Sequence, residues 1–457
     1  MLRLMPPRPV AMVWDTLLPT QIRALPPDLA RLDETLSDPL LLHPFERRWE
    51  HESRHGRPTI PMATYLRLMV IKHRTGWGYE TLVREVSDSL HLRRFCWIAL
   101  DQRVPDESTV RKLTRRLGSA VIDEIIRGLI TKAVRERRFR PRALRTDSTV
   151  AEADIRFPTD SGLCADAVKL LARAGRKLRR AVPTATTWVR DRSRAVGKRL
   201  RALGRTLRRR SGEAKDAVRR MTEEAAEHVR RSVGEARRLL AEAKRRRSAP
   251  QRRGARRRAI ARLQQLVELS ERVVEQVHMR FAGKKIPERL VSLADIEARP
   301  VRRGKLARPN EFGYVVQLAE LTAHTRHGAR GLILPPKLGA GSTPENTLLP
   351  ETVAELETLG IRPKEAVFDA GFTREATEQA MKSTGAGVFI VGTANAGSRR
   401  TRRRLACFRV GCEGRISHLK RGYAAGRSRL RGTEGARIWE AWAILAYDLD
   451  TLAVIAN

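Results

Sequence analysis

The chain has 457 residues, of which 41% are hydrophobic, and this length predicts two to four domains with folded cores. Its formal net charge is +40, because 91 Lys and Arg residues outnumber 51 Asp and Glu residues. This excess predicts an anionic partner, and nucleic acid is the natural one, because each phosphate that is neutralised releases a counterion. No apolar run approaches the roughly 20 residues that a membrane span needs, so we expect no membrane partner.

The four cysteines are too few for a disulfide framework in a chain of this length. The first residues contain early prolines and no continuous apolar segment, so they do not resemble a signal peptide. Both observations favour a reducing, cytoplasmic setting.

The first 140 residues predict a helical N-terminal domain. Apolar residues recur at helical spacing in residues 62–75, and further helices are predicted at 79–90, 109–117 and 119–135. Short Arg-containing helices separated by Gly and Pro are compatible with a helix-turn-helix DNA-binding unit. A plain helical bundle is the alternative, and the sequence does not identify a recognition helix.

Residues 164–284 predict a basic helical insertion. Between residues 171 and 260 there are 31 Lys and Arg but 8 Asp and Glu, which contributes +23 to the net charge. Ala, Arg, Leu and Glu are frequent there and favour helices. An apolar row suited to packing against another helix contains Leu263, Leu266, Val267, Val273, Val274 and Val277. A disordered basic linker is the alternative.

From residue 285 onward, strand and helix patterns alternate. Strands are predicted at 313–321, 331–335, 365–369 and 387–391, and helices at 346–359, 374–382, around Glu413, and at 433–449. An isolated strand at 144–149 precedes the insertion. We therefore predict an α+β fold: the helical N-terminal domain (1–140), then an α/β core with a mixed sheet flanked by helices (141–163 and 285–457), interrupted by the insertion (164–284).

Two acids follow strand-like segments. Asp147 follows the stretch 142–146, and Asp369 follows the apolar pair Val367 and Phe368. An acid at a strand end is exposed at the edge of a sheet, where a ligand can approach closely. Taken singly, each acid is more often a simple turn residue.

A third acid, Glu413, lies on a predicted helix between two cations. Arg409 precedes it by four residues and Lys420 follows it by seven, so the three share one helix face. Spacing alone favours a salt-bridged surface helix. A carboxylate between cations also suits a site for metal and phosphate, and two Mg²⁺ ions about 4 Å apart clamp the attacking and leaving oxygens of a phosphodiester.

Several segments, in order, resemble the bacterial insertion-sequence transposases of the DDE type, which have an RNase H-like catalytic core. The helical N-terminal domain of that family is matched by residues 43–45, 64–67, 78–80 and 106–109. Its acid motifs are matched by residues 145–149, 368–372, and 413–423 with 432–435, and the segment before its second strand by 304–305 and 311–313. One such motif would be weak, but their common order makes the resemblance specific.

The resemblance implies catalytic and metal-binding roles for Asp147, Asp369 and Glu413, which would hold two Mg²⁺ ions, or Mn²⁺ in their place. Arg409 and Lys420 match the two cations of the third motif and would contact terminal-repeat phosphates. We expect the neighbouring Arg415 and Arg421 to bind DNA as well.

Two positions depart from the family pattern. Ala406 stands where the third motif has a tyrosine, and Phe372 replaces the tyrosine that usually follows the second acid. The first departure puts in doubt any step that depends on that tyrosine, but neither affects the three acids.

The implied function is that of a DNA transposase in the bacterial cytoplasm, associated with the nucleoid. It would bind double-stranded terminal inverted repeats and target DNA, cleave strands, and transfer the resulting 3′-OH ends. Because two ends must be paired, we expect a homodimer or larger assembly on DNA, and we expect the insertion to follow the DNA backbone. The alternatives are a related metal-dependent nuclease without strand transfer, and a catalytically inactive, transposase-derived DNA-binding protein. A basic RNA-binding scaffold would explain the charge but not the ordered acid motifs.

Overall fold

The structure is a computed structural model that describes residues 1–6, 18–50, 58–206, 212–246, 251, 253–302, 310–341 and 343–455. It has two compact units: unit 1 comprises Met1–Asp154 and Val301–Asn457, and unit 2 comprises Ile155–Pro300. Helices and a mixed sheet confirm the predicted α+β class. The motif segment 304–305 lies outside the described residues.

The first part of unit 1 is helical, as predicted. Its elements are α2 (Thr20–Arg23), α3 (Pro27–Leu36), the 3-10 helix η1 (Pro39–Leu42), α4 (His43–Trp49), α5 (Met62–Thr75), α6 (Tyr79–Asp88), α7 (Leu90–Phe95) and α8 (Glu107–Arg135). Helix α5 has the predicted bounds, and its residues 62–73 are all buried. It ends before Gly76, whose φ of 70° is in the left-handed region that glycine adopts without strain.

Helix α8 joins the two helices predicted at 109–117 and 119–135. Its backbone departs from helical geometry only at Gly118, where φ is 75°. The backbone N–H of Ser119 donates to the Glu434 carboxylate at 2.7 Å, and the Ser119 hydroxyl binds the same carboxylate at 2.9 Å. A carboxylate from the other end of the chain therefore caps the second half of α8.

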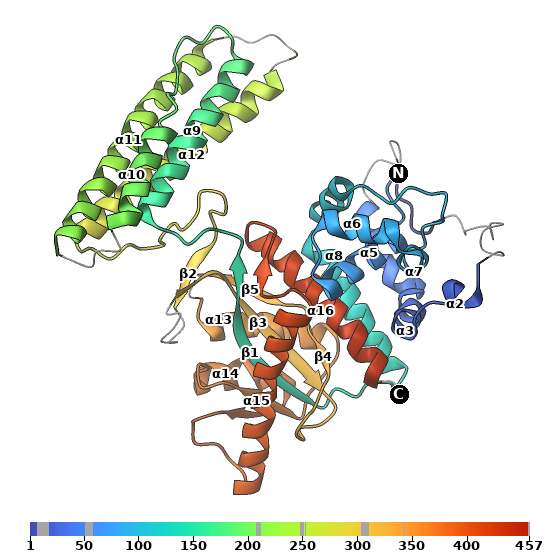
Figure 1. Ribbon diagram of the computed structural model, residues 1–457. Helices are drawn as coiled ribbons and strands as arrows, with labels where there is room; N and C mark the ends of the chain where they lie inside the picture. The colour runs from blue at the N-terminus through green and yellow to red at the C-terminus, as the bar shows by residue number, and fades with distance from the viewer. Residues whose placement is uncertain are drawn as a thin grey trace. The chain divides into compact units, whose positions relative to one another are not determined.

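One sheet of eight described strands forms the centre of unit 1 (Figure 1). The strands are β1 (Ala143–Ala153), β2 (Arg299–Arg302), β3 (Asn310–Thr322), β4 (Leu332–Ile333), β5 (Lys337–Ala340), β6 (Glu365–Phe368), β7 (Gly387–Ile390) and β8 (Arg427–Ser428). The main order is β2-β3-β1-β6-β7, with β4 and β5 also paired to β3 and β8 paired to β1. Strand β1 is antiparallel to β3 and parallel to β6, so the sheet is mixed.

Strand β1 is longer than the predicted strand at 144–149. Its pairing with β3 runs from Ala143, opposite Thr322, to Glu152, opposite Gly313, and β8 pairs with its last residues. Asp147 therefore lies near the middle of a strand, and the prediction that this strand ends at the acid was wrong. The partners that extend β1 are more than 150 residues away in sequence, so local pattern could not indicate its length.

Helices from the second half of the chain cover the sheet. They are α13 (Glu345–Thr358), α14 (Arg374–Met381), the 3-10 helix η3 (Lys382–Thr384), α15 (Arg399–Gly422) and α16 (Thr433–Ile455). Helix α15 contacts β1 and β6, and α13 contacts β3 and β5. Helix α16 contacts α3, α5 and α8 as well as β4 and β5, so N-terminal helices and sheet share one core. For this reason the compact units do not divide at residue 140.

Unit 2 is a bundle of helices: α9 (Asp160–Ala181), α10 (Ser193–Thr206), α11 (Gly212–Arg245) and α12 (Arg253–Phe281) (Figure 1). The apolar row predicted on the last helix is buried in its core. The unit begins before the predicted insertion, because Thr159 caps α9 by accepting from the N–H of Gly162 at 3.1 Å. It ends later, because Leu290 and Leu293 pack in the same core.

Candidate active site

The three predicted acids come from three different elements of unit 1. Asp147 lies in β1, Asp369 directly follows β6, and Glu413 lies on α15. Because β1 and β6 are parallel neighbours with Thr146 opposite Phe368, the residues that follow these two lie side by side. Helix α15 contacts both strands and brings Glu413 to the same place.

The guanidinium of Arg409 contacts all three carboxylates. Its Nη2 atom lies 3.0 Å from Oδ2 of Asp147 and 3.0 Å from Oδ2 of Asp369. Its Nη1 atom forms an ion pair with Oε1 of Glu413, one helical turn further along α15. The resemblance implied that Arg409 contacts DNA; what the structure shows is its contact with the three acids.

Exposure rises across the three acids. The side chains of Asp147, Asp369 and Glu413 are 8%, 34% and 63% exposed, whereas that of Arg409 is 11% exposed. Asp147 is therefore the buried anchor of the group, and the N–H of Ser148 donates to its Oδ1 at 2.8 Å. Glu413 is the acid that solvent and a ligand reach most easily.

Burial and charge act in opposite directions at this site. Burial raises the pKa of Asp147, while Arg409 and the Ser148 N–H partly lower it. At Arg409, burial lowers the pKa, but the three carboxylates raise it above its ordinary value. The pKa values of both groups are therefore raised. Arg409 has three anionic neighbours that favour its charged form, whereas Asp147 has one cation beside it and is repelled by two acids.

Among the residues that the structure describes, no three Asp, Glu, His or Cys side chains form a ready metal cluster. The three acids turn toward the guanidinium of Arg409 instead. As a donor set they nevertheless fit Mg²⁺, which takes hard carboxylate oxygens and keeps several waters. A divalent ion held by these acids would compete with Arg409 for the same oxygens.

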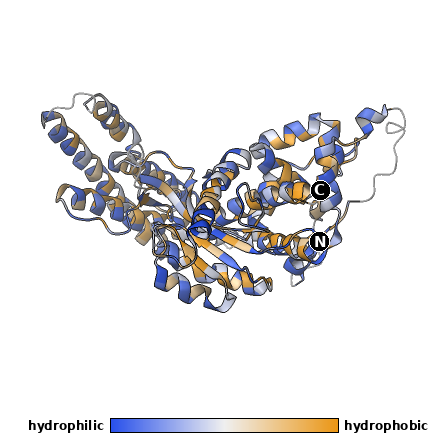
Figure 2. Cartoon of the chain, turned by 90° about the horizontal axis from the view of Figure 1, so that it is seen from below, coloured by the Kyte–Doolittle hydropathy of each residue, from blue (hydrophilic) through white to orange (hydrophobic). Residues whose placement is uncertain are grey.

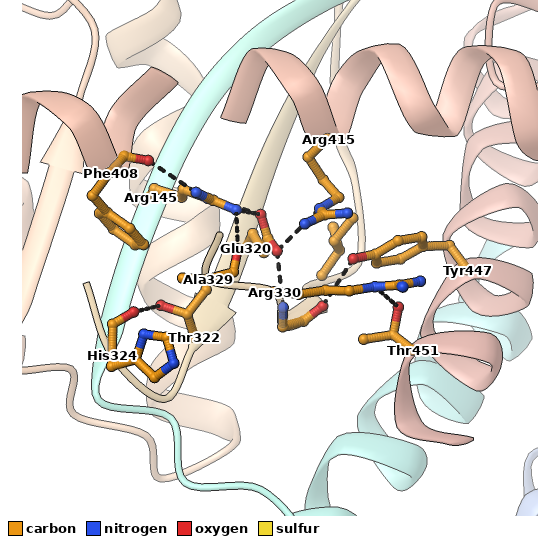
Figure 3. A network of polar contacts seen from close by, with 12 residues as sticks. Arg145, Glu320, Thr322, His324, Ala329, Arg330, Phe408, Arg415, Tyr447 and Thr451 are labelled. Carbon is orange, nitrogen blue, oxygen red and sulfur yellow. Dashed lines mark hydrogen bonds and ion pairs between the residues drawn. The ribbon is translucent and has the colours of Figure 1, made fainter. Parts of the chain in front are cut away.

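Figure 3 shows a buried ion pair between Arg145 and Glu320. It lies on the face of β1 that also carries Asp147, because Arg145 precedes Asp147 by two residues on the strand. The side chains of Arg145 and Glu320 are each 2% exposed, and their nearest atoms are 2.7 Å apart. Arg145 also donates to the carbonyl oxygens of Phe408 and Ala329, both at 2.9 Å. Because Phe408 precedes Arg409, this pair fixes α15 at the position where it meets the acids.

Close packing at Gly411 belongs to the same arrangement. A Cβ atom there would lie 2.1 Å from Nη1 of Arg145, so only glycine fits while the guanidinium keeps its place. Neither Arg145 nor Gly411 was predicted as a site residue from the sequence. A signal for Arg145 was present, since a charged residue two positions before Asp147 on a strand must share its face.

The other predicted DNA-binding cations have different surroundings. Arg415 donates to the buried Glu320 at 3.2 Å and lies over the ring of Tyr447 (Figure 3). Lys420 is half-buried and donates to the carbonyl oxygen of Val150 at 3.0 Å. Arg421 is exposed on α15. The structure thus brings Arg409 to the acids, packs Arg415 into the neighbouring network, and leaves Arg421 at the surface.

The fold and the site together define a basic protein with a cluster of carboxylates and cations on a mixed sheet, a combination suited to chemistry on a polyanion. Residues 21–116 match the family model of a transposase domain (DUF772), which covers the helices from within α2 into α8. No curated protein and no solved structure matches the chain.

The family match supports a transposase family, and such a family implies binding to DNA. It covers helices of unit 1 and does not reach the sheet or the three acids. No helix among the described residues is both long and apolar enough to cross a membrane.

Proposed function

We propose that the chain is an insertion-sequence transposase that cleaves and joins DNA strands at the cluster of Asp147, Asp369 and Glu413. The observation that carries this proposal is the convergence of the three acids, which are spread over 267 positions of sequence, on one guanidinium. The transposase domain and the net charge of +40 support DNA as the substrate. The mixed sheet flanked by helices supports an RNase H-like core.

The three acids would hold Mg²⁺, or Mn²⁺ in its place. When two such ions are bound, they activate water and stabilise the leaving oxygen of the phosphodiester. Asp147 supplies the fixed part of the site, because it is buried and held by a backbone N–H. Glu413 is the most exposed of the three acids and would be the first that a DNA strand meets.

Arg409 would bind the scissile phosphate. Its planar guanidinium pairs as well with phosphate as with carboxylate oxygens, so it can exchange one for the other. A phosphate at this position would draw Arg409 away from the carboxylates and leave their oxygens for the divalent ions. Lys420 and Arg421 follow on the same helix and would extend the contact to neighbouring phosphates.

The reaction has two steps. In the first, water adds across a phosphodiester at the end of the element, which leaves a 3′-OH and a 5′-phosphate. In the second, the oxygen of that 3′-OH attacks a phosphodiester of target DNA, forms a new P–O bond, and releases a target 3′-OH that takes up the proton. Both steps are displacements at phosphorus and need no redox partner.

The proposal is tested with Asp147→Asn, Asp369→Asn and Glu413→Gln, assayed on a duplex that carries the inverted repeats next to the gene. We expect each variant to lose about 100-fold or more in Mg²⁺-dependent nicking. We also expect weaker Mn²⁺ binding by electron paramagnetic resonance, with DNA affinity kept. Glu351→Gln, the same chemical change at an exposed position of α13, is the matched control. Full nicking by any of the three acid variants would remove that acid from the site.

Two rival functions share parts of this site and need separate assays. A nuclease without strand transfer would nick the repeat but fail to join a pre-cut 3′-OH end to a target plasmid. A catalytically inactive DNA-binding protein would bind the repeat with no Mg²⁺-dependent nicking at all. The transposase requires both nicking and joining.

Pairing of two DNA ends requires at least two protomers. We expect light scattering of the purified complex with repeat DNA to give two or more chains per paired-end complex. One chain per paired-end complex would contradict this part of the proposal.

A further inference from the structure

The cations of unit 2 differ in how many of them are neutralised by acids. On α11 and at the residue that directly follows it, exposed arginines pair with glutamates of α11 or of α12. The pairs are Arg219–Glu223 at 3.3 Å, Arg231–Glu227 at 3.2 Å, Arg246–Glu242 at 3.2 Å, and Arg237–Glu271 at 2.5 Å. Neighbouring glutamates therefore neutralise much of the positive charge of this helix.

Helix α9 carries a row of exposed cations without such balance. Lys169, Arg173, Lys177 and Arg180 follow one another at intervals of four, four and three residues, which places them on one face. No acid occurs between Asp166 and Asp191. Within the part of the chain that the structure describes, none of the four has an acidic partner at salt-bridge distance. We call these four residues the α9 row.

The opposite face of α9 is buried, and this keeps the α9 row facing solvent. Leu171, Gly175 and Leu178 on that face are buried in the bundle. A Cβ at Gly175 would lie 2.8 Å from a methyl group of Val189, so the packing there is close. Helix α9 cannot turn its cations inward without breaking this core, and the row stays exposed to solvent. Figure 2 shows hydrophilic and hydrophobic residues alternating along the helices of this bundle.

A second row lies on α10, which packs against α9. Arg194, Lys198 and Arg201 are exposed at intervals of four and three residues, and they too have no acidic partner among the described side chains. We call them the α10 row. The connection between the two helices carries Trp188, which is 63% exposed and lies 3.4 Å beneath the guanidinium of Arg179.

We propose that the α9 and α10 rows form a surface that binds the backbone of double-stranded DNA without reading its sequence. The choice of DNA rests on the proposed function. The α9 row extends over about 16 Å at 1.5 Å per residue, a length along which duplex DNA presents several phosphates. Both rows consist only of Lys and Arg, which suits contacts to phosphates that position a protein on DNA.

The test compares two variants of the full chain that lose the same charge. In the first, Lys169, Arg173, Lys177 and Arg180 are all replaced by Gln. In the second, which we call the α11 control, Arg219, Arg231 and Arg237 of α11 and Arg246 directly after it are replaced by Gln. Fluorescence anisotropy then measures affinity for a 40-base-pair duplex of arbitrary sequence between 50 and 300 mM KCl, and circular dichroism checks that both variants are folded.

Each lost phosphate contact reduces the slope of log affinity against log salt by about 0.9. We expect the α9-row variant to lose at least about 2 in slope and about tenfold or more in affinity at 100 mM KCl. We expect the α11 control to change the slope by less than about 1. The proposal would be overturned if the α9-row variant lost less slope than this, or if both variants lost the same amount of slope.

A second variant keeps the proposal testable if the first fails to fold. Replacing Arg194, Lys198 and Arg201 by Gln alters the other row alone, and an unchanged slope there would then count against the surface. Competition with duplex RNA is measured beside DNA, and rows that contribute only to RNA affinity would also overturn it.

Failure of this inference and failure of the proposed function give different results. If the chain nicks repeat DNA but both row variants bind as the wild type does, the surface is wrong and the catalytic proposal stands. If the row variants lose affinity but the wild type never nicks DNA, the surface stands and the catalytic proposal fails.

Discussion

Gly411 is the residue through which α15 comes closest to Arg145. Gly411→Ala would place a methyl group 2.1 Å from a guanidinium nitrogen that cannot withdraw, because Arg145 also binds Glu320 and two carbonyl oxygens. We expect the substitution to lower the free energy of unfolding by about 1–3 kcal/mol. It should also slow nicking, because α15 carries Arg409 and Glu413. Urea unfolding and the nicking assay measure the two effects.

Gly414 provides the matched control on the same helix. A Cβ there meets no atom within 4 Å, so Gly414→Ala should leave α15 in place and stabilise it by up to about 1 kcal/mol. Equal destabilisation by both substitutions would show that loss of glycine, rather than contact with Arg145, is what matters.

Arg409 compensates the charge of a buried carboxylate. In Arg409→Gln, Asp147 would keep its burial but lose its cation, and breaking a buried pair costs about 3–5 kcal/mol. Because Asp369 and Glu413 are more exposed, we expect a smaller loss in the free energy of unfolding, about 1–3 kcal/mol at pH 7 in the presence of EDTA. Arg421→Gln, at an exposed site on the same helix, should change it by less than about 0.5 kcal/mol.

The sign of the pH dependence follows from the raised pKa of Asp147. A carboxyl whose pKa is higher in the folded state stabilises the fold below its unfolded pKa, and this stability is lost as pH rises through the folded pKa. Loss of Arg409 raises the folded pKa further. The free energy of unfolding that Arg409→Gln loses relative to the wild type should therefore be small near pH 4 and grow toward pH 7. A loss that shrinks as pH rises would contradict this account.

At the scale of elements, α16 contains a buried acid whose protonation should control stability. Glu440 is 1% exposed, and burial raises its pKa to about 8, although the positive charge of Lys420 acts in the opposite direction. The contribution of Glu440 to the free energy of unfolding should be fully present below about pH 4.3 and should decline as the pH rises toward 8. Relative to Glu440→Gln, the wild type should lose at most about 1.4 kcal/mol per pH unit.

Urea unfolding at pH 5, 6, 7 and 8, followed by tryptophan fluorescence, measures this difference. Other titrating groups are common to both proteins and cancel in the comparison. Glu351→Gln, at an exposed position, should keep the wild-type pH slope. Identical slopes for the wild type and Glu440→Gln would show that Glu440 is charged in the folded state.

Elements with strong local patterns were predictable from sequence, and contacts between distant elements were not. Periodicity predicted α5 to the residue, and the strand predicted at 365–369 matches β6 to within one residue. The end of β1 was missed, because it depends on pairing with β3 and β8. Helical spacing grouped Arg409 with Glu413, but only the packing of α15 on β1 and β6 shows that Arg409 reaches Asp147 and Asp369.

At the scale of the whole molecule, positive charge is densest in unit 2, whereas the three acids lie in unit 1. Unit 2 has a net charge of +24 in 146 residues, whereas unit 1, which contains the three acids, has +16 in 311 residues. The surplus in unit 2 exceeds what its own acids can pair, and its α9 row is the clearest instance. Under the proposed function, this division would let unit 2 hold DNA while the acids of unit 1 act on it.

The same surplus should make unit 2 sensitive to salt. Like charges on a folded surface repel one another, and salt screens that repulsion within a Debye length of about 10 Å at 0.1 M. Exposed ion pairs weaken as well, but each contributes little to stability. We expect the Tm of the wild type to rise by about 2–4 °C between 50 and 500 mM KCl, as for a gain near 1 kcal/mol.

Replacing the α9 row by Gln separates charge repulsion from general salt effects. This variant should begin with a higher Tm at 50 mM KCl, because it lacks four unbalanced cations, and its Tm should then rise less with added salt. The α11 control should begin lower, because its glutamates lose their partners. Calorimetry measures the Tm of the three proteins at both salt concentrations. A wild-type Tm that falls with added KCl would show that ion pairs outweigh charge repulsion in the free protein.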